Sequence, residues 1–254
     1  MRAQNANFSE VASSTRALST GSCQLPIRYY AGDWCGVLYR VDLARARFFC
    51  EALAVEPWPV LGAAVAGVYA WDYRESSIGP YAELGIGLLT RRRGRHPSLV
   101  RSLFESSPQN DQGLLVLSLP VTTQTACVAG KELWGYPKYV TRIGTRFDEN
   151  AARVRLGTEL ELDLGPVHGL RCPVPLATFT DLHGQLLRTQ VDVHIRPKVG
   201  VPSQCSLHLL GGDGQSAEVV QALGLHHAQP MLAFHSRAFS AILPAGKVIG
   251  PAHR

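Results

Sequence analysis

The clearest structural pattern in this chain is the stretch Arg153-Val154-Arg155-Leu156-Gly157-Thr158-Glu159-Leu160-Glu161-Leu162-Asp163-Leu164. Its even-numbered positions carry apolar side chains and one threonine, whereas its odd-numbered positions carry charged side chains and one glycine. Successive side chains of a β-strand point to opposite faces, so this period of two predicts a strand, or a bent hairpin, with one face in water.

Shorter segments on both sides of this stretch also carry strand signals. Apolar and polar residues alternate over 191–195, and residues 114–121 are nearly all apolar, as in a buried strand. Residues 206–210 precede the run Gly211-Gly212-Asp213-Gly214, which is typical of a tight turn. Strands therefore dominate the predicted secondary structure.

Helix signals are fewer. Asp42 is a suitable N-cap for a helix that runs to Leu53, and Ser216 for a helix that ends before Gly224. Two more helices are expected over 98–104 and 237–243. Many strands with a few peripheral helices predict an α+β fold that is mainly antiparallel β, arranged as a closed or nearly closed barrel.

Composition and length indicate one main domain. The chain has 254 residues, of which 46% are hydrophobic, enough to bury a large core. Residues 1–22 are rich in Ser, Thr, Ala and Asn and are expected to form a flexible arm, or an arm that orders on a neighbouring subunit. Residues 23–254 show no linker and are expected to form a single domain. The longest apolar run, 61–70, is about half a membrane span.

Charge and cysteine usage exclude several classes of protein. The net charge is +5, but the one dense basic run, 91–96, lacks interleaved aromatic residues, so nucleic-acid binding is not expected. We interpret this run as a solvated loop, or one that helps to attract an anionic substrate. None of the six cysteines forms a Cys-x-x-Cys pair, so no metal centre is predicted. Reduced cysteines and the absence of an apolar leader favour a cytoplasmic protein without membrane attachment.

One segment stands out for chemistry: Gly130-Lys131-Glu132-Leu133-Trp134-Gly135-Tyr136-Pro137-Lys138-Tyr139. Lysine occurs only at positions 131, 138, 198 and 247, yet one lies in this aromatic stretch, directly after a proline that stiffens the backbone. If Trp134, Tyr136 and Tyr139 exclude water, the neutral amine of Lys138 is favoured, and a neutral amine attacks carbonyl groups to form a Schiff base. The alternative from the pattern alone is a surface lysine beside a turn.

The same segment resembles the catalytic motif of the acetoacetate decarboxylase family, which runs Gly-Arg-Glu-Leu-x-x-Tyr-Pro-Lys-Lys. Three further landmarks follow the family's order: Tyr39-Arg40-Val41-Asp42 resembles its Tyr-Arg-Thr-Asp, Tyr81-Ala82-Glu83 its Tyr-x-Glu, and Ile242-Leu243-Pro244 its Ile-Leu-Pro. The resemblance extends from about residue 25 to 250.

This resemblance implies a barrel that uses a lysine iminium to break a bond in a β-keto acid or a related carbonyl compound. Lys138 would be the nucleophile and Glu83 the carboxylate that orients groups or moves protons. Tyr139, Tyr136, Trp134 and Arg28 would contact the substrate. The resemblance implies no metal and no organic cofactor, and it implies an assembly of several copies of the chain.

Several positions depart from the family's pattern. Tyr139 stands where the decarboxylases have a second lysine, residues 67–70 lack the second glutamate of the pocket, and Arg28 is only the nearest candidate for its arginine. Two alternatives therefore stay open. The chain is an aldolase- or dehydratase-type lyase in which Tyr139 acts as acid or base, or it is a non-catalytic barrel that binds a small molecule.

Overall fold

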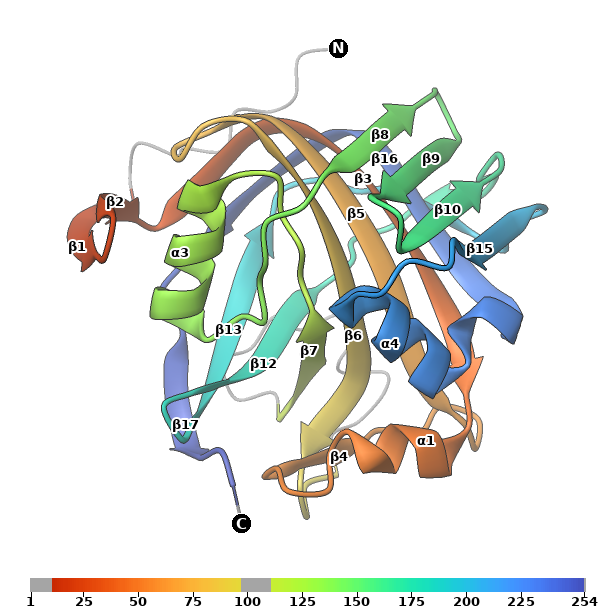
Figure 1. Ribbon diagram of the computed structural model, residues 1–254, viewed down its shortest axis with the longest axis horizontal. Helices are drawn as coiled ribbons and strands as arrows, with labels where there is room; N and C mark the ends of the chain where they lie inside the picture. The colour runs from red at the N-terminus through yellow and green to blue at the C-terminus, as the bar shows by residue number, and fades with distance from the viewer. Residues whose placement is uncertain (1–10, 97–110, 254) are drawn as a thin grey trace.

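The computed structural model describes residues 11–96 and 111–253, and its centre is a closed barrel of seven strands (Figure 1). In order around the barrel these are β3 (Ile27–Val41), β5 (Ala64–Ser76), β6 (Tyr81–Arg92), β7 (Gln112–Ser118), β12 (Leu176–Leu182), β13 (Gln185–Val193) and β16 (Pro230–Leu243). Only the β7–β12 pair among them is parallel. Pairing of β13 with β16 closes the ring, which confirms the predicted antiparallel β-barrel.

A second, antiparallel sheet of four strands packs against the outside of the barrel, at the upper right of Figure 1. It contains β8 (Ile143–Phe147), β9 (Ala152–Leu156), β10 (Leu160–Leu164) and β15 (Cys205–Leu209). The alternating stretch 153–164 is therefore a hairpin, β9–β10, and its leucines and Val154 are buried as expected. The alternation breaks at the turn, where Thr158 is exposed and Glu159 is buried.

Short strands surround these two sheets. They are β1 (Ser14–Leu18), β2 (Gly21–Leu25), β4 (Val55–Pro57), β11 (Leu170–Arg171), β14 (Lys198–Gly200) and β17 (Lys247–Pro251). Strands β1 and β2 form a hairpin, so residues 14–22 of the expected flexible arm have regular structure. The hairpin is fixed to helix α3 (Gln124–Trp134), because the Ser19 amide donates a hydrogen bond to a Glu132 carboxylate oxygen at 2.9 Å.

The helices correct several predictions. Helix α1 (Leu43–Phe48) is capped by Asp42 as expected but ends before Leu53, and α4 (Gln215–Leu223) begins after Gly214 and not at Ser216. Helix α3 was not predicted from the sequence. A 3₁₀ turn, η1 (Leu225–His227), follows α4. No helix among the described residues is long and apolar enough to cross a membrane.

The helix expected over 237–243 is wrong, because these residues form the end of β16. Phe239, Ala241 and Leu243 lie in the barrel interior at a spacing of two, as the pleat of a strand requires. The segment also pairs with β3 on one side and with β13 on the other, and these ladders satisfy its backbone groups. The helix expected over 98–104 lies outside the described residues.

The basic run 91–96 is not a fully solvated loop. Arg91 and Arg92 belong to β6 and form ion pairs with Glu56 at 2.9 Å and with Asp111 at 3.3 Å. Arg93 donates hydrogen bonds to backbone carbonyl oxygens between Cys50 and Val55. These guanidinium groups therefore bind the chain itself, which leaves less of their charge for attracting a substrate.

Strand alternation separates two hydrophobic cores. One core lies between the barrel and the four-stranded sheet with its helices α1 and α4, and the other fills the barrel. Strand β5 shows the division most clearly: Ala66, Val68 and Ala70 face the first core, and Tyr69, Trp71 and Tyr73 face the second. Small residues thus let the two layers approach, while large aromatic rings occupy the interior of the barrel.

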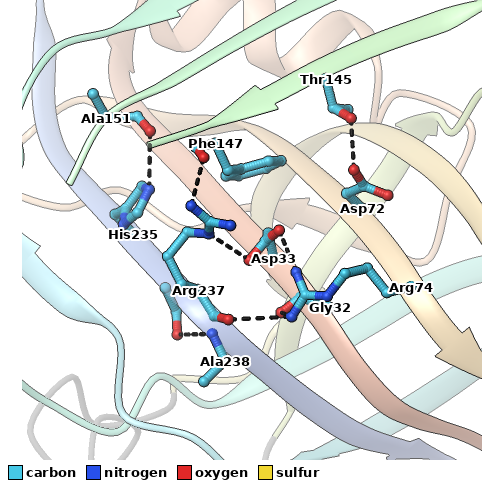
Figure 2. A network of polar contacts seen from close by, with 11 residues as sticks. Gly32, Asp33, Asp72, Arg74, Thr145, Phe147, Ala151, His235, Arg237 and Ala238 are labelled. Atoms are coloured by element: carbon cyan, nitrogen blue, oxygen red, sulfur yellow. Dashed lines mark hydrogen bonds and ion pairs between the residues drawn. The ribbon is translucent and has the colours of Figure 1, made fainter. Parts of the chain in front are cut away.

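A buried carboxylate connects the two layers where the barrel meets β8, as Figure 2 shows. Asp33 is only 4% exposed and binds two guanidinium groups, those of Arg237, at 2.8 Å, and Arg74. Arg237 also donates a hydrogen bond to the carbonyl oxygen of Phe147 at 2.6 Å. Charge-assisted hydrogen bonds of this kind are about twice as strong as neutral ones, so the network fixes the outer sheet on the barrel.

A second buried carboxylate, Glu159, holds the N-terminus of α4. Gly214 precedes this helix and offers no side-chain cap. Glu159 instead accepts hydrogen bonds from the amides of Ser216, at 3.0 Å, and Ala217, at 3.3 Å. It also accepts one from the Tyr139 hydroxyl at 2.8 Å. A negative charge at the positive end of the helix is favourable, so Glu159 caps α4 from a distant turn.

We expect Glu159→Ala to lower the free energy of unfolding by about 2 kcal/mol, because two helix amides and the partly buried Tyr139 hydroxyl lose a charged acceptor. Urea denaturation followed by circular dichroism measures this. Glu161→Ala is the matched control, since that neighbouring glutamate is only partly buried and faces Arg155 at 4.0 Å; it should change stability by less than about 0.5 kcal/mol. Equal losses in the two variants would show that Glu159 has no special capping role.

Candidate active site

The motif at 130–139 begins as the last turn of α3 and leaves it through a left-handed glycine. Gly135 has a φ of 66°, and its amide donates to the carbonyl of Lys131 at 3.0 Å. This bond is that of an αL helix end, and the Tyr136 amide in turn donates to the carbonyl of Gly130 at 3.1 Å. A Cβ atom at position 135 would overlap with the Asp181 carbonyl, so the chain can turn here only with glycine.

After this turn the chain is extended and runs beside residues 119–121. The Leu119 amide donates to the Pro137 carbonyl at 3.1 Å, and the Val121 amide to the Tyr139 carbonyl at 2.9 Å. In an extended segment, neighbouring side chains point to opposite sides. Lys138 therefore points into the barrel, whereas Tyr139 points out toward Glu159 and Ser216.

Lys138 forms an ion pair with Glu83 inside the barrel. Each residue is 6% exposed, and Lys138 Nζ donates a hydrogen bond to Glu83 Oε2. The amine also lies 5.7 Å from the centre of the Tyr81 ring and 5.8 Å from that of Tyr136, within the range of cation–π attraction. The two charged groups come from β6 and from the extended end of the motif, 55 residues apart in sequence.

The stem of Lys138 passes directly over Gly130 of α3. A Cβ atom added to Gly130 would overlap with Cδ and Cε of the lysine. The lysine therefore reaches Glu83 through a channel that the missing side chain of Gly130 leaves open. This relation explains why a helix with good propensity otherwise carries a glycine near its end.

Tyrosine hydroxyls surround the ion pair. Tyr73 forms a hydrogen bond with Glu83, and burial, followed by the nearby carboxylate, raises the pKa of Tyr73 well above its usual value. The Tyr29 and Tyr81 hydroxyls lie 3.0 Å apart, and Tyr136 is fixed by Thr178 at 2.9 Å. Burial also raises the pKa values of these three tyrosines. The hydroxyls therefore stay protonated and act as hydrogen-bond donors at neutral pH.

A cavity of about 70 Å³ adjoins the ion pair, with room for on the order of five water molecules. Aromatic rings form much of its wall: Tyr29, Tyr69, Trp71, Tyr73, Tyr136 and Phe239. Glycine and aliphatic residues of β6 and β7 supply much of the rest. Among the described residues that line the cavity, Glu83 and Lys138 are the two that carry a charge.

The structure brings three of the expected site residues to this cavity: Lys138, Glu83 and Tyr136. It does not bring Tyr139, Trp134 or Arg28 there.

Trp134 is fully buried behind Tyr136, with their ring centres 6.1 Å apart, and its Nε1 donates to the Pro244 carbonyl at 2.9 Å. Arg28 donates hydrogen bonds to the Val11 carbonyl at 2.7 Å and to the Ser13 hydroxyl at 2.9 Å, in the segment before β1. These contacts fix the motif and the N-terminal segment on the barrel.

Sequence reasoning missed the aromatic wall, although a signal was present. Tyr69, Trp71 and Tyr73 alternate with Ala70 and Asp72, and Tyr81 precedes Glu83 by two positions. A period of two places each set on one face of its strand.

The described residues include no group of three or more His, Cys, Asp or Glu side chains that could hold a metal ion.

Comparisons with known proteins agree with the barrel fold. A model of the family "Acetoacetate decarboxylase (ADC)" matches residues 16–160. Acetoacetate decarboxylase from Legionella pneumophila subsp. pneumophila str. Philadelphia 1 has a similar structure, with a TM-score of 0.64 and 17% identity over 98% of this chain and 94% of that one. No curated protein sequence matches the chain.

Two further solved structures share the fold. The enduracididine biosynthesis enzyme MppR, complexed with pyruvate, has a TM-score of 0.61 and 18% identity over 94% of this chain and 98% of that one. An acetoacetate decarboxylase-like enzyme from Sphingomonas wittichii RW1 has a TM-score of 0.55 and 15% identity over 88% and 92%. Since the family model covers more than half of the sequence, this chain belongs to the acetoacetate decarboxylase family.

Proposed function

We propose that this chain is a lyase that forms a Schiff base between Lys138 and the carbonyl group of a β-keto acid or a related carbonyl compound. One observation carries the proposal: the Lys138 amine is buried against an aromatic cavity and in contact with a carboxylate, Glu83. A lysine with a merely structural role has no need of a cavity beside its amine. Membership of a family of enzymes supports the same conclusion.

The proposed reaction begins when the Lys138 ammonium passes a proton to Glu83 and the lone pair of Nζ then attacks the carbonyl carbon. Proton transfers release the carbonyl oxygen as water and leave an iminium cation. The iminium then accepts the electron pair of the bond between the α-carbon and its leaving group, which gives an enamine. Protonation at the α-carbon and hydrolysis release the product and free Lys138.

Glu83 is placed to transfer the protons that these steps require. Its carboxylate contacts the amine in the resting site and balances the positive charge once the iminium forms. The aromatic wall excludes bulk water, which strengthens this electrostatic interaction. The protonated Tyr73 hydroxyl, in turn, hydrogen-bonds to Glu83 and holds it in place.

Cleavage or formation of a carbon–carbon bond other than decarboxylation is a second candidate for the later steps. One structure of MppR, a fold neighbour with a TM-score of 0.60, holds the condensation product of pyruvate and imidazole 4-carboxaldehyde. A similar barrel can therefore hold the product of a condensation between two carbonyl compounds. In this chain the retro-aldol version would release an aldehyde or ketone in place of CO₂.

The nucleophile is tested by borohydride reduction in the presence of acetone, followed by peptide mass spectrometry. Lys138→Met should abolish the adduct, because no other described lysine lines the cavity. The same variant should lose about 3 kcal/mol of stability, since Glu83 is left buried without its partner, and Lys138→Met/Glu83→Gln should recover much of that loss. Lys131→Met, at an exposed position of α3, is the control and should label normally. An adduct that persists in Lys138→Met would refute the assignment.

The role of Glu83 is tested through the exchange of acetone hydrogens in D₂O, which an iminium–enamine cycle catalyses and which proton NMR follows. Glu83→Gln should slow this exchange by about 10²–10⁴-fold, the usual contribution of a positioned acid or base. Borohydride trapping should persist at long incubation times, because reduction is irreversible and also captures an iminium that forms slowly. If Glu83→Gln exchanged acetone hydrogens at the wild-type rate, a group other than Glu83 would transfer the protons.

The space over Gly130 gives a test in which neither Lys138 nor Glu83 is replaced. Gly130→Ala should keep the fold, because alanine favours the helix and the end of a lysine side chain can move aside. The displaced amine should then react with acetone at least about tenfold more slowly, as misplaced groups lose the advantage of orientation. Gly144→Ala is the control, since its added methyl group meets open space. Normal trapping in Gly130→Ala would show that the channel does not position Lys138.

A further inference from the structure

The charges around the cavity balance without any substrate. Of the described residues that line it, Lys138 and Glu83 carry opposite charges and contact each other. Thr178 and the tyrosine hydroxyls are neutral, and the other lining residues are apolar or glycine. Within residues 11–96 and 111–253, the site therefore holds one positive and one negative group, and neither is left over for a charged ligand.

Three arginines of β3, β5 and β16 have partners outside the cavity. Arg28 is bound to the segment before β1, and Arg74 and Arg237 share the buried Asp33 on the outer face of the barrel (Figure 2). None of the three lines the cavity. Moving Arg74 or Arg237 inward would leave Asp33, which is 4% exposed, with a single counter-charge.

A substrate carboxylate would consequently be an unbalanced charge. The iminium on Lys138 has the same charge as the ammonium that it replaces, so Glu83 still neutralises it. A carboxylate in the cavity would add a second anion close to Glu83 and among aromatic rings. Burying an unpaired ion in such surroundings is strongly unfavourable, whereas a neutral group of the same shape gains from leaving water.

We infer that the cavity selects small uncharged aldehydes or ketones and discriminates against keto acids. This inference rests on the proposed Schiff-base function and narrows its substrate class. A substrate without a carboxylate has no CO₂ to lose. The bond that breaks is then the carbon–carbon or the carbon–oxygen bond of a β-hydroxy carbonyl compound. In the carbon–carbon case its electron pair enters the enamine, and the hydroxyl proton passes to Glu83. In the carbon–oxygen case Glu83 removes the α-proton to give the enamine, whose electron pair then expels the β-hydroxyl group, and this leaves as water with that proton.

Two compounds of matched shape test the inference. Acetoacetate and 4-methyl-2-pentanone have the same branched skeleton of non-hydrogen atoms, and they differ in carrying a carboxylate or an isopropyl group. Each is titrated into the protein with borohydride, and the modification of Lys138 is quantified by mass spectrometry. Any adduct that arises from acetoacetate counts, including the acetone adduct that decarboxylation would leave.

We expect half-maximal labelling by the ketone at a concentration about 100-fold or more below that for acetoacetate, as the penalty for an unpaired buried charge implies. Equal or stronger labelling by acetoacetate would overturn the inference and leave the Schiff-base function intact. If neither compound labels Lys138, both are overturned.

The variant Glu83→Gln provides an internal check on the cause. It removes the anion that a carboxylate would meet and leaves the shape of the cavity nearly unchanged. The preference for the ketone should therefore fall by about tenfold or more, whatever the absolute rate of trapping in the variant. An unchanged preference would mean that shape, and not charge balance, sets the selectivity, which would also overturn the inference.

Discussion

A buried ion pair, Lys138 with Glu83, is the constraint on which the rest of the site depends. Removing two charged groups from water carries a large penalty, and close contact with good hydrogen bonding is needed to offset it. Two fixed elements carry the charged groups: β6 carries Glu83, and the extended end of the motif carries Lys138. Strand β6 is paired on both sides, and the extended end is hydrogen-bonded to residues 119–121. Tyrosine rings and hydroxyls complete the shell around the pair, and the missing side chain of Gly130 leaves the lysine its path.

The barrel supports this arrangement through the division of its strands into two faces. Small residues on the outer face of β5 allow the four-stranded sheet and α4 to pack closely, and the Asp33 and Glu159 networks hold that layer in register. Large aromatic residues on the inner face enclose the cavity. Tyr139 shows how the two sides are linked: it follows Lys138 directly, yet its hydroxyl belongs to the network that caps α4. The position next to the lysine therefore couples the site to the outer layer and does not contribute a group to the cavity.

Much of the fold and part of the candidate site could be predicted from the sequence, and each wrong prediction has a physical cause. The hairpin at 153–164 follows from alternation alone, and Lys138 and Glu83 from motifs that resemble those of the family. The resemblance implied that Tyr139, which follows Lys138 directly, contacts the substrate. Neighbours in an extended segment face opposite ways, so its hydroxyl lies at Glu159 instead. The segment 237–243 was expected to be a helix, but it is a strand that pairs with β3 and β13. Pairing between segments far apart in the sequence is not visible in a local pattern. The aromatic lining of the barrel could have been inferred from the spacing of Tyr69, Trp71 and Tyr73.

The central claim of the proposed function is that Lys138 reacts with a carbonyl group in a small, aromatic, charge-balanced cavity. A crystal structure of the protein after borohydride reduction with 4-methyl-2-pentanone tests this claim most directly. The account predicts continuous electron density from Lys138 Nζ into the cavity, with the alkyl group against the aromatic wall and the Glu83 carboxylate still beside the nitrogen. An adduct on another lysine, or a Lys138 side chain turned out of the barrel and away from Glu83, would contradict it.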